Sequence, residues 1–177
     1  CRVLLKYLIS KITNYPIGAI QIETTPNGKP YVSLKLKSHI HFNISHSGNH
    51  AAIAISQESP VGVDIEQIVS NKDFKNIADM MFHPEEIAWL NSFIDAEYIN
   101  AFYTLWTRKE ATLKASGLGL TIDTKNFSSL EINYPITLPI DNRRWIIEDL
   151  KIQNAYSAAI SYRGKKLNTH CISLNNN

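Results

Sequence analysis

The spacing of apolar residues divides the chain into helical and extended stretches. Leucine and isoleucine recur every three or four positions from Arg2 to Ile12, which predicts an amphipathic helix. Alternating and β-branched runs then predict strands in the segments 19–23, 31–36, 41–45, 51–56 and 61–68. The last two of these strands are expected to lie next to each other, with the sequence QESP as the turn between them.

The hydrophobic period becomes helical in the second half of the chain. It predicts a short helix around residues 74–81, another that opens at Pro84, and a long helix over residues 96–116 that Gly117 ends. The tail alternates again, which predicts strands at 127–132, 144–150, 156–162 and 167–172. This order of elements indicates an α+β protein with a boundary near Pro60.

Two acidic residues interrupt the apolar run VGVDIEQI at residues 61–68. Because side chains alternate along a strand, Asp64 and Glu66 share one face with Gly62. An unpaired buried carboxylate is costly, so a compensating cation is expected beside them. Two positions along a strand span about 6.6 Å, which lets both carboxylates reach one cation. Gly62 is expected to leave open space for a ligand.

The long predicted helix contributes a third carboxylate. Residues four apart share one stripe of a helix. The stripe carries Phe102, Trp106, Glu110 and Lys114. The stripe begins with aromatic residues, which mark it as facing the core, and ends with charged ones. If helix and sheet pack against each other, Glu110 could join Asp64 and Glu66 around one cation. Three oxygen ligands without a histidine or cysteine cluster favour Mg²⁺ over zinc. Pairing of the strand acids with arginines, or their exposure at a sheet edge, stays open as the alternative.

Composition and charge narrow the class of protein. The chain has 177 residues, 44% of them hydrophobic, and a net charge of +2, which is too small to indicate nucleic acid as the main partner. Its two cysteines, Cys1 and Cys171, do not form the pattern of a disulfide framework or a zinc site. The longest apolar run, residues 51–55, is far too short to span a membrane. A cytoplasmic protein with no membrane and no nucleic-acid partner is therefore expected.

Five motifs follow one another along the chain. They are GKP at residues 28–30, FNISHSG at 42–48, VGVDIE at 61–66, MFHPEE at 81–86 and FYTLWTRKEATLKASGLGL at 102–120. Together they resemble the 4′-phosphopantetheinyl transferases of the surfactin-synthetase type. The resemblance implies transfer of the 4′-phosphopantetheine arm of coenzyme A to a serine of an apo acyl, peptidyl or aryl carrier protein, with release of 3′,5′-ADP.

The same resemblance implies a fold and a domain organisation. Members of this family are pseudo-dimers of two similar α/β lobes with the active site in the cleft between them, and the two-lobed type is usually monomeric. Residues 1–59 would be the remainder of the N-terminal lobe, and residues 60–177 the C-terminal lobe that carries the magnesium-binding acids. The first lobe would be truncated at its N-terminus, because the family has a further segment before the part that matches Arg2 to Ile12.

The resemblance also assigns roles to individual residues. The magnesium-binding acids would be Asp64, Glu66 and Glu110. The coenzyme A contacts would be Arg2, Lys29, Ser45, His46 and Lys114. The catalytic residues would be Glu110, Lys114 and Glu86. Lys114 would contact the phosphate or assist proton transfer. Either Glu110 or Glu86, directly or through a water molecule, would accept the proton of the serine.

Two other functions compete with this one. A Mg²⁺-dependent nuclease also uses acidic pairs on strands. In such enzymes the lysine normally follows the pair on the same strand, whereas Gln67 and Ile68 follow Glu66 in this chain. A non-catalytic module that binds coenzyme A or a carrier protein is the second alternative, and the retention of all three acids argues against it.

Overall fold

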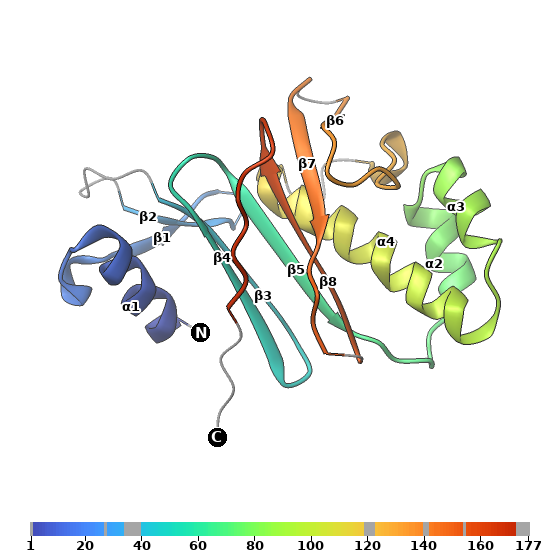
Figure 1. Cartoon of the computed structure of the whole chain (residues 1–177), viewed down its shortest axis with the longest axis horizontal. Coiled ribbons are helices and arrows are strands. Elements are labelled where there is room, and N and C mark those ends of the chain that lie inside the picture. The colour runs from blue at the N-terminus through green and yellow to red at the C-terminus, as the bar shows by residue number, and fades with distance from the viewer. Residues whose placement is uncertain are drawn as a thin grey trace.

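The computed structural model describes residues 2–26, 28–33, 40–118, 123–139, 142–153 and 155–172 of the chain. These residues form a mixed arrangement of helices and antiparallel strands, so the predicted α+β class is confirmed at this level (Figure 1). The helices are α1 (Arg2–Thr13), α2 (Phe74–Met81), α3 (Pro84–Leu90) and α4 (Asp95–Ser116), with the short 3₁₀ helices η1 (Ile17–Ala19) and η3 (Thr124–Asn126). The strands are β1 (Ile22–Thr24), β2 (Pro30–Val32), β3 (His41–Ser47), β4 (His50–Ser56), β5 (Val61–Gln67), β6 (Ile136–Thr137), β7 (Arg144–Asp149) and β8 (Tyr156–Arg163).

Antiparallel pairing organises these strands into separate sheets. β1 pairs with β2, β3 pairs with β4, and a four-stranded sheet has the order β5-β8-β7-β6. In Figure 1, α1 and the β1–β2 pair lie at one end of the molecule, and α2 and α3 lie at the other. β3 and β5 lie side by side between these ends.

β4 and β5 lie in contact across the short turn, as predicted, but the ladder partner of β5 is β8 and not β4. β4 is paired along its length with β3, and Asp64 of β5 lies opposite Ala159 of β8. β3 meets β5 through side chains instead, since the Val63 amide donates to Asn43 Oδ1 at 3.0 Å. A side-chain oxygen thus satisfies a backbone donor that would otherwise need a strand carbonyl.

Helix α4 packs against β5, β8 and β7. It ends where predicted, at Gly117, whose φ of +71° is the left-handed conformation that follows many helices. Gly62 of β5 lies so close to α4 that a Cβ atom there would be 2.2 Å from the Ala111 carbonyl oxygen. The prediction that Gly62 leaves open space for a ligand is therefore wrong, because the backbone of α4 fills that space.

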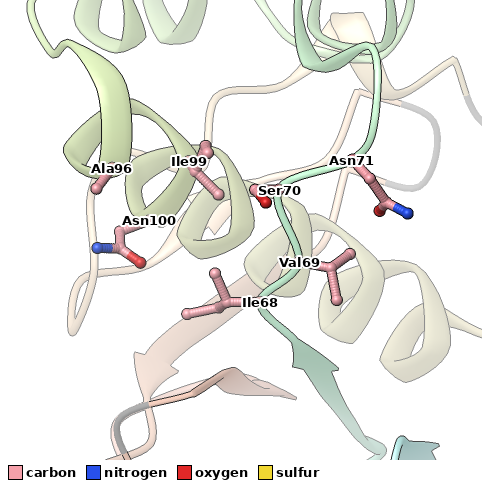
Figure 2. Close-up of a pocket in the computed structure, with 7 residues that line it drawn as sticks. All are labelled: Ile68, Val69, Ser70, Asn71, Ala96, Ile99 and Asn100. Atoms are coloured by element: carbon pink, nitrogen blue, oxygen red, sulfur yellow. The ribbon is translucent and has the colours of Figure 1, made fainter.

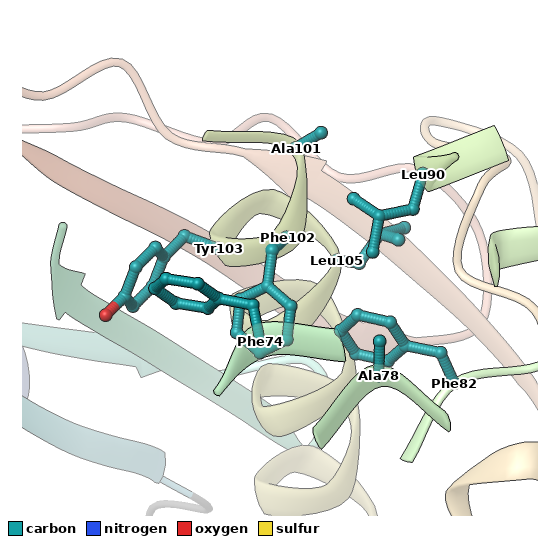
Figure 3. Packing of buried hydrophobic residues seen from close by; sticks show 8 residues of the cluster. All are labelled: Phe74, Ala78, Phe82, Leu90, Ala101, Phe102, Tyr103 and Leu105. Atoms are coloured by element: carbon teal, nitrogen blue, oxygen red, sulfur yellow. The ribbon is translucent and has the colours of Figure 1, made fainter. Parts of the chain in front are cut away.

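Separate apolar cores hold the helices in place. Figure 3 shows the core at α2, α3 and α4, where Phe102 packs against Phe82 with ring centroids 5.2 Å apart. Phe102 also stacks on Trp106 at 6.0 Å, which forms the aromatic part of the predicted stripe. A second core contains Leu5 of α1 and Phe42 of β3, both buried. Glu110 and Lys114, the catalytic candidates on α4, thus come about one to three turns after a well-packed aromatic segment of the same helix.

Two strands predicted in the tail are not formed in the described part of the chain. Residues 127–132 and 167–172 contain no strand. In the first segment, the Ser129 carbonyl oxygen accepts a hydrogen bond from Arg108 of α4 at 3.1 Å. In the second, the Leu167 amide donates to a tyrosine hydroxyl of β8 at 3.1 Å. In both segments a side chain therefore forms a hydrogen bond with a backbone group that would otherwise pair with a neighbouring strand.

The other predicted elements are present, some with shifted ends. The strand predicted at residues 19–23 corresponds to β1, which begins only after η1. The strand predicted at 31–36 corresponds to β2, and residues 34–36 lie outside the described part. Helices α1 to α4 and strands β3, β4, β5, β7 and β8 lie close to their predicted positions. Across the described residues, no helix combines the length and apolarity that crossing a membrane requires.

Candidate active site

The carboxylate of Asp64 lies at the centre of a charged cluster where β3, β5 and α4 meet. Asp64 is only 2% exposed. Its Oδ1 atom accepts a hydrogen bond from the Ser45 hydroxyl at 2.8 Å and pairs with the Lys114 ammonium at 2.5 Å. Lys114 also donates to the Ser45 hydroxyl at 3.0 Å, which closes a triangle of polar contacts. Lys114, and not an arginine, is therefore the cation that balances Asp64.

The second oxygen of Asp64 is unpaired. Oδ2 is buried and accepts no hydrogen bond from any residue that the structure describes. Buried polar atoms are nearly always hydrogen-bonded, so such an oxygen indicates the place of a ligand, a water molecule or an ion. Burial raises the pKa of Asp64; Lys114 and Ser45 oppose this shift, and the charge of Glu66 adds to it.

Glu110 brings a third acid into the same electrostatic environment. Burial is the main cause that raises the pKa of Glu110, and the negative charge of Asp64 raises it further. Lys114 opposes the shift, and Glu66 adds to it. The structure thus brings Asp64 and Lys114 into direct contact, and the charges of Asp64, Lys114 and Glu66 all act on Glu110. That the three acids share one cation stays a prediction.

The donor atoms of this cluster suit a hard divalent cation, although no coordination shell is assembled. Within the described ranges, no three His, Cys, Asp or Glu side chains are arranged so that they could hold a metal ion. The chemistry of the donor set nevertheless fits, because carboxylate oxygens are the protein ligands that Mg²⁺ prefers. Among the described residues, Oδ2 of Asp64 is a buried oxygen of this cluster that has no hydrogen-bond partner.

Lys29 reaches the same region from the segment between β1 and β2, in a way that the sequence did not indicate. Its ammonium donates to the carbonyl oxygens of Lys114 and Ala115 at 2.6 and 2.8 Å. A cation at the C-terminus of a helix compensates unpaired carbonyl groups. Burial lowers the pKa of Lys29 to about 8. Lys29 thus ties the N-terminal part of the chain to the end of α4, and its contact with coenzyme A stays a prediction.

Glu86 is fully buried and its carboxylate is enclosed by donors. Its side chain is 0% exposed. Oε1 accepts from the amide and the hydroxyl of Ser129 at 2.7 and 2.6 Å. Oε2 accepts from the His83 amide at 2.8 Å and pairs with Lys109 at 2.8 Å. Four donors occupy this carboxylate and join α3 to α4 and to Ser129, while the role of Glu86 in catalysis stays a prediction.

Two predicted coenzyme A contacts lie on the surface. Arg2 begins α1 and His46 lies opposite Ala51 in the β3–β4 pair, and both side chains are exposed. In the described contacts, neither residue is hydrogen-bonded to the carboxylate cluster, which the structure therefore builds without them. Their binding of coenzyme A stays a prediction.

A separate hollow lies beyond the end of β5 (Figure 2). Its volume is about 550 Å³. It is lined by the segment after β5 and the first turns of α4: Ile68, Val69, Ser70, Asn71, Ala96, Ile99 and Asn100. None of the predicted site residues is among these, so the hollow is distinct from the carboxylate cluster.

A buried acid paired with a lysine, together with two further carboxylates whose charges act on the same groups, defines a class of site whose charged residues suit phosphate chemistry. Comparison with known families agrees with this class. The family model described as the 4′-phosphopantetheinyl transferase superfamily matches residues 60–167, and one described as 4′-phosphopantetheinyl transferase, N-terminal, matches residues 1–58. The chain therefore belongs to the 4′-phosphopantetheinyl transferase superfamily, which confirms the resemblance drawn from its motifs.

Individual relatives support the same assignment. The chain is 43% identical over 122 residues to the 4′-phosphopantetheinyl transferase gsp of Aneurinibacillus migulanus. This match covers 69% of this chain and 48% of that protein. It is 32% identical over 164 residues to the 4′-phosphopantetheinyl transferase psf-1 of Bacillus pumilus, with 91% and 68% covered. It is 29% identical over 183 residues to the L-aminoadipate-semialdehyde dehydrogenase-phosphopantetheinyl transferase of Mus musculus, with 92% and 59% covered. The chain thus spans about half to two thirds of the length of these relatives.

The sequence analysis missed one set of residues at this site. Asn43, Ser45 and Ser47 alternate along β3, and all three form hydrogen bonds to β5. Of these three, the sequence analysis named only Ser45, which it predicted to contact coenzyme A and not Asp64. The period of two in the sequence NISHS was the signal that could have placed all three on the face toward the acids.

Proposed function

We propose that this chain transfers the 4′-phosphopantetheine arm of coenzyme A to a serine of an apo acyl, peptidyl or aryl carrier protein and releases 3′,5′-ADP. Relatives that share the matched segments are named as 4′-phosphopantetheinyl transferases. The observation that carries the proposal is the contact of Lys114 with the buried Asp64, with Glu110 close enough for its pKa to respond to both.

Mg²⁺ is the proposed cofactor, and Asp64, Glu66 and Glu110 would hold it. When bound, such an ion polarises the phosphorus and stabilises the leaving nucleotide. Two observations support this assignment. Among the described residues, Oδ2 of Asp64 is buried without a hydrogen-bond partner, and the negative charges of Asp64 and Glu66 both raise the pKa of Glu110, with Lys114 opposing them.

Lys114 would orient the diphosphate of coenzyme A. Its ammonium is held by Asp64 and Ser45, so its charge has a defined position at the end of α4. A lysine ammonium acts as a compact point charge toward phosphate oxygens. Phosphoryl transfer depends mainly on such positioning and on charge neutralisation.

Glu110 is the better candidate for the residue that accepts the serine proton. In the proposed reaction, a bond forms between the serine oxygen and phosphorus, and the bond from phosphorus to the leaving nucleotide breaks. The serine proton passes to Glu110, directly or through a water molecule. Burial raises the pKa of Glu110, which makes its carboxylate a stronger proton acceptor. Glu86 has four donors on its oxygens and is fully buried.

The architecture of two similar lobes, residues 1–59 and 60–177, belongs to the same proposal, as does the monomeric state. Its support is that both segments contribute to the cluster: Ser45 comes from the first, and Asp64 and Lys114 come from the second. Coenzyme A would lie where the two segments meet.

Incubation of the chain with coenzyme A, Mg²⁺ and an apo carrier protein tests the function, with the mass of the carrier as the readout. A gain of one phosphopantetheine group is expected. Asp64→Asn and Glu110→Gln should lower the rate by at least about 10²-fold while the chain stays folded. Glu58→Gln, at an exposed glutamate in the β4–β5 turn, is the matched control.

The rival functions predict other results. Nicked DNA in place of a modified carrier would support the nuclease, and tight binding of coenzyme A without any transfer would support a non-catalytic module. Full activity of Asp64→Asn would refute the role of the cluster.

A further inference from the structure

Strand β3 holds the acids of β5 through alternate side chains. Ser45 donates to Asp64 Oδ1 at 2.8 Å, and Ser47 donates to Glu66 Oε2 at 2.8 Å. Asn43 accepts from the backbone of β5 one step earlier. Because strand residues two apart share a face, this spacing places Ser45 and Ser47 opposite the two acids of β5, and Asn43 opposite the Val63 amide.

Ser47 binds both the side chain of one β5 residue and the backbone of the next. Its hydroxyl oxygen accepts the Gln67 amide at 3.0 Å while its proton points to Glu66 Oε2. A hydroxyl has one proton to donate. The amide approaches the oxygen as a donor, so the proton remains for the carboxylate. Ser47 thus fixes one oxygen of Glu66 against the backbone of the same strand.

The turn after Ser47 keeps this serine in place. Gly48 has a φ of +54°, and a Cβ atom there would lie 2.5 Å from Gln67 Oε1 and 2.6 Å from the Tyr156 hydroxyl. The Asn49 amide donates to the same Tyr156 hydroxyl at 3.3 Å. The tip of the β3–β4 hairpin therefore packs directly on the ends of β5 and β8, which limits how far Ser47 can move from Glu66.

We propose that Ser47 is a positioning residue that holds the Glu66 carboxylate in place for the divalent cation. The inference rests on the proposed function, because it concerns a ligand of the proposed cofactor. Residues that hydrogen-bond to metal ligands set the orientation of those ligands, and their loss typically weakens metal binding about 10- to 100-fold.

Direct binding of Mn²⁺ to the 177-residue chain tests this role. Electron paramagnetic resonance of the free ion measures the Kd without any reaction. Ser47→Ala should weaken binding about 10- to 100-fold, and Ser47→Thr, which keeps the hydroxyl, should restore most of the affinity. Ser56→Ala is the matched control, since Ser56 also ends a strand and accepts backbone amides, at 3.2 Å each, but at the other end of the β3–β4 hairpin.

A double-mutant cycle separates positioning from a general effect on folding. If Ser47 acts through Glu66, then Ser47→Ala should change the Mn²⁺ affinity little in a chain that already carries Glu66→Gln. Thermal unfolding of each variant checks that the chain is folded, and Ser47→Gly, which also removes the hydroxyl, carries the test if the alanine variant does not fold.

The possible results distinguish a failure of the Ser47 role from a failure of the proposed function. Mn²⁺ binding by the unchanged chain with equal binding by Ser47→Ala would overturn the role of Ser47 and leave the proposed function standing. Equal losses from Ser47→Ala with and without Glu66→Gln would also overturn it. A chain that transfers no phosphopantetheine and binds no Mn²⁺ would overturn the proposed function together with this inference.

Discussion

Replacement of Gly62 by alanine tests whether the close approach of β5 to α4 positions the charged cluster. A Cβ atom at this position would lie 2.2 Å from the Ala111 carbonyl oxygen and 2.3 Å from the Ala115 nitrogen. Real Cβ contacts essentially never fall below 3.0 Å, so strand and helix must separate by at least 0.8 Å, the difference between 3.0 and 2.2 Å. Glu110 and Lys114 would move with the helix.

The cost of this separation is high because the obstacle is main chain. No side-chain rotation relieves the clash, and overpacking in a core costs about 1–3 kcal/mol, occasionally more. We expect Gly62→Ala to lie at the upper end, about 3 kcal/mol. At about 2–4 °C for each kcal/mol in a chain of this size, the Tm should fall by roughly 6–12 °C. A displacement of reacting groups by about 1 Å also lowers rates by about 10²-fold.

Urea unfolding, followed by tryptophan fluorescence, gives the loss of stability, and the mass of a carrier protein gives the loss of transfer. Gly18→Ala is the matched control, since a Cβ atom at Gly18 would meet nothing within 4 Å. If Gly62→Ala were as stable and as active as Gly18→Ala, the close contact of β5 with α4 would not position the cluster.

Two further predictions concern buried charges. Lys109→Met leaves Glu86, its partner at 2.8 Å, as an unpaired buried carboxylate. It should lower the free energy of unfolding by about 3–5 kcal/mol in urea, and a second change, Glu86→Gln, should recover part of that loss; undiminished stability of Lys109→Met would contradict this ion pair. Lys29 has a folded pKa of about 8, below its ordinary value of 10.5, so between these two values the unfolded chain binds more protons and stability rises with pH. The free energy of unfolding of the unchanged chain, less that of Lys29→Met, should therefore be constant below pH 8 and increase from pH 8 to 10.5; a difference that stays flat across this window would show that the Lys29 charge is not buried.

Local pattern was enough to locate most elements and the members of the carboxylate cluster. Helical spacing placed α4 and its end at Gly117, because a helix with one buried face repeats its apolar residues with the helical period. Strand alternation placed Asp64 and Glu66 on one face of β5, and spacing by four placed Glu110 and Lys114 on one stripe of α4. Each of these predictions needs only the geometry of a single strand or helix.

The partners of the charged groups depended on which segments meet in space. The sequence carries no local sign that Lys109 and Ser129 bind Glu86, or that Lys29 binds the end of α4. The same holds for Gly62, whose missing side chain admits the backbone of α4 and not a ligand.

The sequence by itself thus determined the elements and the faces that carry the acids, whereas the tertiary structure decided how each acid is compensated. Residues 127–132 illustrate the reason, since their composition suits a strand but the Ser129 carbonyl oxygen is taken by Arg108. Backbone and side-chain groups compete for the same donors and acceptors, and the outcome depends on contacts between residues far apart in the chain.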